Sequence, residues 1–129
     1  MRLRLALLWF FLLASSPVFA APESLTVLAA PDIEIPVSRY KANTRNLILW
    51  LPSENGVVRA EHDTAAKLAQ HGYNVWVADL FGARFLPIVP SSLDEIPAAD
   101  VASLIQVAAK QYRKIYLVSS GRGAELALM

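Results

Sequence analysis

A short stretch close to the end of the chain holds the residues best suited to nucleophilic chemistry. It reads KIYLVSSGRGAELAL, from Lys114 to Leu128, and its pattern predicts a strand, a sharp turn of small residues and a new helix. Many α/β enzymes hold their nucleophile on such a turn. Ser119 and Ser120 offer hydroxyls beside it, whereas Gly121 stands at its apex. Serines at strand ends usually hydrogen-bond nearby backbone, so a structural role and a nucleophilic role both stay open.

Two histidines and one aspartate are the other candidates for acid–base chemistry. His62 and His71 fall on a predicted helix or at its end, where the helix dipole favours histidine, so we expect surface or helix-end residues rather than bases. Neither has the spacing of a metal ligand, and we expect no metal and no cofactor. Asp79 comes at the carboxyl end of a predicted strand, where it lines a cleft or, as turn preference favours, caps the next loop.

Strands that alternate with helices must position these residues. Two short alternating stretches around a Pro31-Asp32 turn predict a pair of strands, and Pro36 predicts an edge position because proline cannot donate to a ladder. Continuous apolar runs predict three strands buried on both faces, and periodic patterns predict three helices. The predicted buried strands are 46–51, 73–80 and 114–119; the predicted helices end near 71, follow 97 and begin at 121, and segment 81–97 is expected to cross the surface.

This alternation predicts the α/β fold class, as a three-layer α/β/α sandwich with a mostly parallel sheet. Residues 1–20 have two arginines, an apolar run and Val18-Phe19-Ala20, which predict a signal peptide cut after Ala20. The run is shorter than the roughly 20 residues that span a bilayer, so we expect a mature chain that does not span the membrane. Residues 21–129 are expected to form the N-terminal part of a domain that is cut short after the elbow strand.

The mature chain has no composition that favours nucleic acid. All 11 acidic residues and ten of the 12 basic ones follow Ala20, which gives a formal charge of −1, and no basic cluster occurs. The chain has no cysteine and hence no disulfide. The segment GRG departs from a dinucleotide-binding motif because Leu126 replaces its third glycine. We expect export to the periplasm or the extracellular space; no protein partner is indicated.

From Asn46 to Met129 the order of elements resembles the α/β-hydrolase superfamily. Within it, the turn SENG, the helix end AQHGY and the strand end VAD are similar to the secreted, virulence-associated VirJ-type hydrolases. The resemblance implies an ester or acyl hydrolase that acts on a small-molecule or lipid ester. It also implies an acid and a histidine after the nucleophile, but only Glu125 follows the turn here.

The superfamily elbow reads G-x-S-x-G, with the serine on a strained turn. Aligned on VSSGRGA, this pattern puts Gly121 in the place of the serine, Ser119 at the first small position and Gly123 at the last glycine. A shift by one residue would make Ser120 the nucleophile instead, and a shift by two Ser119; these registers stay open.

An oxyanion hole would use backbone N–H groups, which the resemblance places at Arg122 and in the turn that contains Glu54 and Asn55. A polar turn that merely caps the next helix explains the same residues. The expected function is therefore a secreted α/β-hydrolase-like protein, either an ester or acyl hydrolase or, given Gly121, a non-catalytic binding module.

Overall fold

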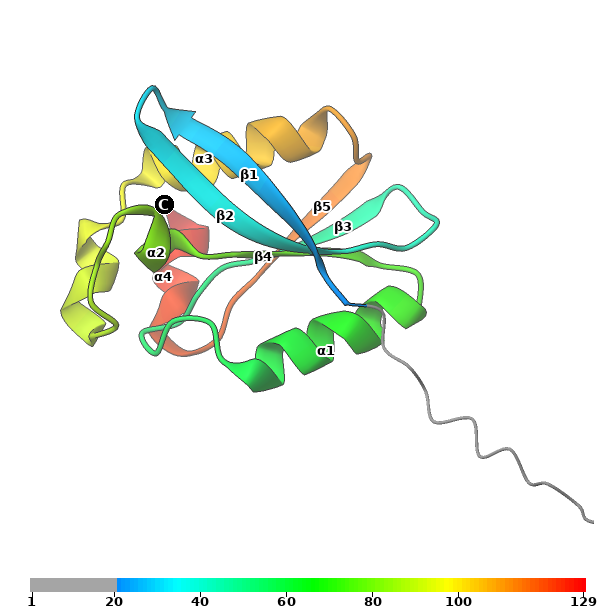
Figure 1. Ribbon diagram of the computed structural model, residues 1–129, viewed down its shortest axis with the longest axis horizontal. Helices are drawn as coiled ribbons and strands as arrows, with labels where there is room; N and C mark the ends of the chain where they lie inside the picture. Colours follow the sequence, from blue (N-terminus) through cyan, green and yellow to red (C-terminus); the bar gives the residue numbers. More distant parts are fainter. Residues whose placement is uncertain (1–20) are drawn as a thin grey trace, which may run out of the picture.

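One five-stranded sheet organises the computed structural model, which describes residues 21–129 (Figure 1). The predicted signal peptide lies outside the described residues. The strand order is β1-β2-β4-β3-β5; β1 and β2 form an antiparallel hairpin, β2 is antiparallel to β4, and β3 is parallel to β4 and β5. The strands are β1 Glu23–Ala30, β2 Ile33–Tyr40, β3 Asn46–Trp50, β4 Asn74–Ala78 and β5 Lys114–Val118.

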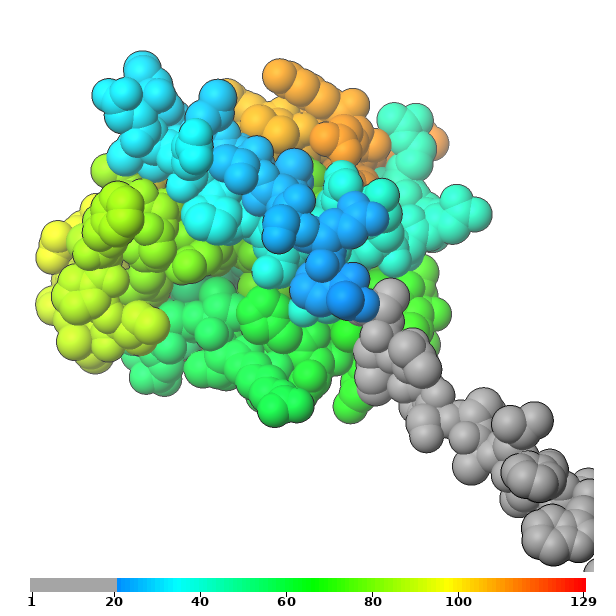
Figure 2. All heavy atoms as spheres, in the orientation of Figure 1, coloured from blue at the N-terminus to red at the C-terminus, as the bar shows by residue number. Residues whose placement is uncertain are grey.

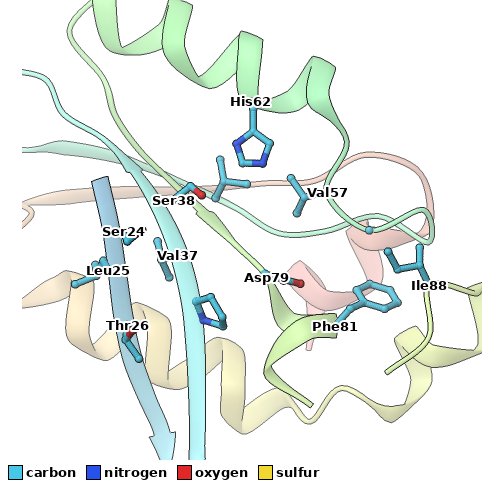
Figure 3. Close-up of a pocket in the computed structure, with 13 residues that line it drawn as sticks. Ser24, Leu25, Thr26, Val37, Ser38, Val57, His62, Asp79, Phe81 and Ile88 are labelled. Carbon is cyan, nitrogen blue, oxygen red and sulfur yellow. The ribbon is translucent and has the colours of Figure 1, made fainter. Parts of the chain in front are cut away.

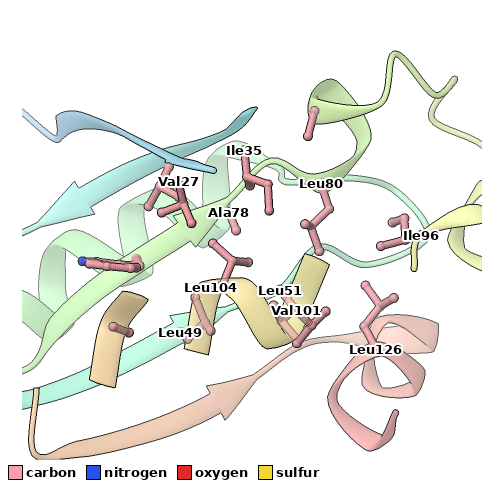
Figure 4. Packing of buried hydrophobic residues seen from close by; sticks show 14 of the residues in the cluster. Val27, Ile35, Leu49, Leu51, Ala78, Leu80, Ile96, Val101, Leu104 and Leu126 are labelled. Carbon is pink, nitrogen blue, oxygen red and sulfur yellow. The ribbon is translucent and has the colours of Figure 1, made fainter. Parts of the chain in front are cut away.

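Helices cover both faces of the sheet, which confirms the predicted α/β/α sandwich. On one face Val101, Leu104 and Ala108 of α3 pack against alternate residues of the strands, among them Leu49 (Figure 4). On the other face Ala65 of α1 packs against the intervening strand residues, which include Ile48 and Val75. The helical segments are α1 Arg59–Gln70, α2 Leu80–Ala83, η1 Pro90–Glu95, α3 Ala98–Ala109, η2 Gly121–Gly123 and α4 Ala124–Leu128.

The structure corrects the predicted edge position of Pro36. Pro36 does not mark an edge strand, because β2 lies between β1 and β4. Pro36 is tolerated there because the pairing of β2 with β4 begins only at Val37; beyond it, the carbonyl of Pro36 accepts the N–H of Asp79 at 2.9 Å.

The last strand, β5, is exposed rather than buried on both faces. Tyr116 is 46% exposed and Leu117 is 36% exposed. The reason is its position: among the described residues β5 is the outermost strand and pairs only with β3. A continuous apolar run therefore did not distinguish an outer strand from an inner one.

The segment after β4 belongs partly to the core. It forms α2 and η1, and Phe81, Leu93 and Ile96 are buried in the main cluster. Arg84, directly after α2, donates two hydrogen bonds to the buried Asp100 of α3, at 2.5 and 2.8 Å. This ion pair attaches the segment to α3.

Candidate functional site

The predicted strand–turn–helix elbow is present at the end of β5. Ser120 still has an extended backbone, with φ −116° and ψ 159°. Gly121 has φ +53°, a left-handed conformation that side chains rarely adopt. The abrupt change of direction therefore falls on Gly121, where η2 begins, and α4 follows η2.

A carboxylate from a distant turn occupies the space beside this glycine. The N–H of Arg122 donates to Oε2 of Glu54 at 2.8 Å, although the two residues are 68 positions apart. A Cβ at position 121 would lie 2.8 Å from Oε1 of Glu54 and closer still to Oε2. Glu54 thus fills the space that a side chain at position 121 would enter.

Backbone donors keep this carboxylate ionised. The backbone N–H of Glu54 itself and that of Arg122, which donates to the carboxylate, lower the pKa of Glu54. The guanidinium of Arg122 lowers it further, although it pairs with Glu125 at 3.1 Å. These two amides are among those proposed as oxyanion donors, and here they face a carboxylate that belongs to the chain.

The other turn amide proposed for that role is engaged elsewhere. The N–H of Asn55 donates to Oγ of Ser53 at 3.1 Å, and Ser53 and Gly56 form a β-bridge that closes the turn.

Gly123 is required by packing. A Cβ there would overlap Oγ of Ser119 and the carbonyl oxygen of Pro52, so the helix approaches the end of β3 as closely as glycine permits. Ser119 also donates a long hydrogen bond, 3.4 Å, to that same carbonyl. Ser119 therefore lies in the packed wall of the elbow, which is a structural position.

Ser120 contacts a carboxylate and not a histidine. Its Oγ donates to Oε1 of Glu61 at 3.0 Å, and Oε2 of the same buried residue accepts the N–H of Val58 at the start of α1. Nδ1 of His62 is hydrogen-bonded to the hydroxyl of Tyr40 at 2.8 Å. His71 donates from Nδ1 to the carbonyl of Lys67, as expected of a histidine at a helix end.

Asp79 combines the two roles that the sequence left as alternatives. Oδ1 accepts the N–H of Gly82 at 2.8 Å and so caps α2. The same residue lines a cavity of about 330 Å³ together with His62 and Phe81 (Figure 3). A side chain at position 82 would overlap the carboxylate of Asp79, so Gly82 permits the cap.

Sequence reasoning missed the side chains of Glu54 and Glu61 at the elbow. The sequence pointed to Glu54 only through its backbone N–H, and it did not indicate Glu61 as a site residue. No local signal pointed to either, because their partners at the elbow lie 68 and 59 residues away. Within residues 21–129 no three side chains gather as a metal site would require, and no helix has the length and hydropathy needed to cross a membrane.

Comparison with known proteins identifies the fold. No family model and no curated protein sequence matches the chain. Solved structures do match: DcsB in complex with its substrate analogue has a TM-score of 0.66 at 18% identity, and the match covers 83% of this chain and 39% of DcsB. A variant epoxide hydrolase from Vigna radiata has a TM-score of 0.62 at 22% identity, with 83% and 33% covered. Est1E from Butyrivibrio proteoclasticus has a TM-score of 0.63 at 12% identity, with 81% and 43% covered.

The described residues have the α/β-hydrolase fold. A further match, an α/β-hydrolase fold protein of unknown function, covers 87% of this chain at a TM-score of 0.63 and 18% identity. The matches cover only 33% to 43% of the solved chains named above. At these identities the likeness concerns the fold, so the chemistry must be argued from the residues of this chain.

Proposed function

We propose that this chain is the N-terminal part of an exported, VirJ-like α/β-hydrolase-like protein that acts as a non-catalytic binding module, because its elbow does not form an acyl-serine intermediate. One observation carries the proposal: the carboxylate of Glu54 accepts the N–H of Arg122 and fills the space beside Gly121. The short motifs SENG, AQHGY and VAD support the VirJ likeness.

Two requirements of serine hydrolysis are unmet at such an elbow. The nucleophile's backbone is strained in this fold, and the strained φ falls on Gly121, which has no hydroxyl. An oxyanion hole stabilises negative charge that develops in the transition state. Here an ionised carboxylate already accepts the N–H of Arg122, so a developing oxyanion would meet both competition and repulsion.

A second candidate is an ester or acyl hydrolase in which Ser120 is the nucleophile and a small-molecule or lipid ester the substrate. The contact of Ser120 Oγ with the buried Glu61 favours it, because a nucleophilic hydroxyl needs a base within hydrogen-bond reach. The extended backbone of Ser120 opposes it, since this residue precedes the strained position.

Labelling with a fluorophosphonate probe distinguishes the two functions. The full natural protein should not be labelled, and Gly121→Ser combined with Glu54→Ala should gain labelling if the rest of the protein supplies a base. Wild-type labelling that Ser120→Ala abolishes and Ser119→Ala leaves intact would refute the proposal and establish Ser120 as the nucleophile. The two serine variants form a matched pair because the hydroxyls are adjacent in the chain.

A further inference from the structure

A groove separate from the elbow runs between the β1–β2 hairpin and the segment after β4. The cavity that Asp79 lines adjoins a second hollow of about 530 Å³, and the two share Thr26 and Pro36. Figure 2 shows this face: β1 and β2 in blue and cyan lie above, the yellow-green segment after β4 lies to the left, and α1 in green lies below. We call this surface the hairpin groove, lined by Thr26, Glu34, Pro36, Asp79, Phe81 and Phe85.

Apolar side chains beside the hairpin groove are left open to solvent. Phe85 is 96% exposed and Ile88 is 63% exposed. Leu28, also 63% exposed, lies two residues from Thr26 in β1 and thus on the same face of the strand. Exposed aromatic and aliphatic groups of this size that gather beside a hollow are typical of an interaction site.

Phe85 also holds an unfavourable backbone conformation. Its φ is +54°, and among the non-glycine residues that the structure describes it alone has a positive φ. A bulky residue in this region costs about 1–2 kcal/mol. Neither the position nor the conformation of Phe85 is explained by burial of its ring, because the ring is exposed.

The charge of the hairpin groove is negative. Asp32 and Glu34 line one end and Asp79 the middle, and none of the three forms an ion pair within residues 21–129. Among residues 21–129, no lysine or arginine lines either hollow. A groove of one charge sign attracts and orients ligands of the opposite sign.

We propose that the hairpin groove binds an extended, positively charged peptide segment of a partner protein. An apolar side chain of the segment covers Phe85, and flanking lysine or arginine side chains pair with Glu34 and Asp79. The hydroxyls of Ser24, Thr26 and Ser38 along the strands supply hydrogen-bond partners for the peptide backbone. The two adjoining hollows favour an elongated occupant over a compact one.

Binding of two matched heptapeptides to the full natural protein tests the proposal. One alternates leucine with lysine and the other leucine with glutamate, and fluorescence anisotropy measures both. The lysine peptide should bind saturably and more weakly as salt rises, and the glutamate peptide should not bind. Equal affinity for both peptides would overturn the proposal.

Phe85→Gly is the decisive variant, since glycine adopts a positive φ without strain. It should lower the affinity for the lysine peptide by about tenfold or more, as expected for loss of an aromatic anchor, without lowering the Tm of the protein. Glu34→Gln should also lower the affinity for the lysine peptide. Glu95→Gln, a residue outside both hollows, should leave that affinity unchanged.

If Phe85→Gly does not fold, the peptide affinities of Glu34→Gln and Glu95→Gln test the proposal instead. Peptide binding that neither Phe85→Gly nor Glu34→Gln weakens would refute the site. Binding of phenethylammonium with the same dependence on both residues, but no peptide binding, would assign the groove to a small organic cation instead.

Discussion

At the scale of single residues, the elbow is built around a glycine whose lack of a side chain leaves space for a carboxylate from a distant turn. Gly121 leaves room for Glu54, and Glu54 satisfies the N–H of Arg122. A resemblance to G-x-S-x-G treats Gly121 as a loss. The structure adds that the carboxylate of Glu54 fills the space beside Gly121, so a larger residue at position 121 would displace this carboxylate.

Gly121→Ala should therefore lower the free energy of unfolding for two separable reasons. The left-handed backbone costs about 1–2 kcal/mol for a residue with a Cβ, and overlap with Glu54 adds to this. Combining Gly121→Ala with Glu54→Gly should restore only the part of the free energy of unfolding that is lost through the overlap with Glu54. Urea denaturation of the double-mutant cycle measures this coupling, and strictly additive effects would show that the two residues do not meet.

The ionisation of Glu54 should also be visible in the dependence of stability on pH. Its pKa is lowered in the folded state, so its contribution is present above the unfolded-state pKa and is lost as pH falls through the folded one. In NMR spectra the amide of Arg122 should shift in a titration centred below the usual glutamate range. Glu54→Gln should abolish that titration; if it persists in the variant, another group is responsible.

At the scale of elements, a buried ion pair determines how the segment after β4 is attached. Asp100 is 1% exposed and receives both hydrogen bonds from Arg84, which is itself only partly exposed. Hydrogen bonding to Asp100 raises the pKa of Arg84, so its guanidinium stays charged throughout the physiological range. Prolines alone suggested a surface crossing, but this contact and the buried Leu93 draw the segment against α3.

Arg84→Ala should destabilise the protein by about 3–5 kcal/mol, because it leaves the carboxylate of Asp100 buried without its cation. The matched control is Arg122→Ala, which removes an exposed pair with Glu125 and should cost at most about 1 kcal/mol by loss of that pair. Chemical denaturation compares the two variants. Equal costs would mean that water reaches Asp100 in the absence of Arg84.

At the scale of the whole molecule, we predict export, which would determine where any ligand is met. The predicted signal peptide lies outside the described residues, so the evidence for it is the sequence: an apolar run followed by Val18-Phe19-Ala20. N-terminal sequencing of the exported protein should begin at Ala21. Recovery of the intact Met1 end from a membrane fraction would contradict this prediction.

The second prediction at this scale concerns residues 21–129 produced by themselves. Exposed apolar groups along the outermost strand β5, such as Tyr116, present an edge that can pair with another chain. We expect association, or a melt without a cooperative transition. A sharp two-state thermal transition from a monomer, by calorimetry and analytical ultracentrifugation, would show that these residues form an independent domain.

The sequence by itself determined most of the strands and longer helices of this protein and the place of the elbow. Periodicity and apolar runs are local properties, and they predicted α3, the buried strands β3 and β4, and the turn around Gly121. Tertiary structure alone decided which strands are neighbours. Because β3 lies directly beside β5, the turn after β3 meets the elbow and brings Glu54 to Arg122, a contact between residues 68 positions apart. The inner position of β2 and the exposure of β5 follow from the same strand order, which no local pattern encodes.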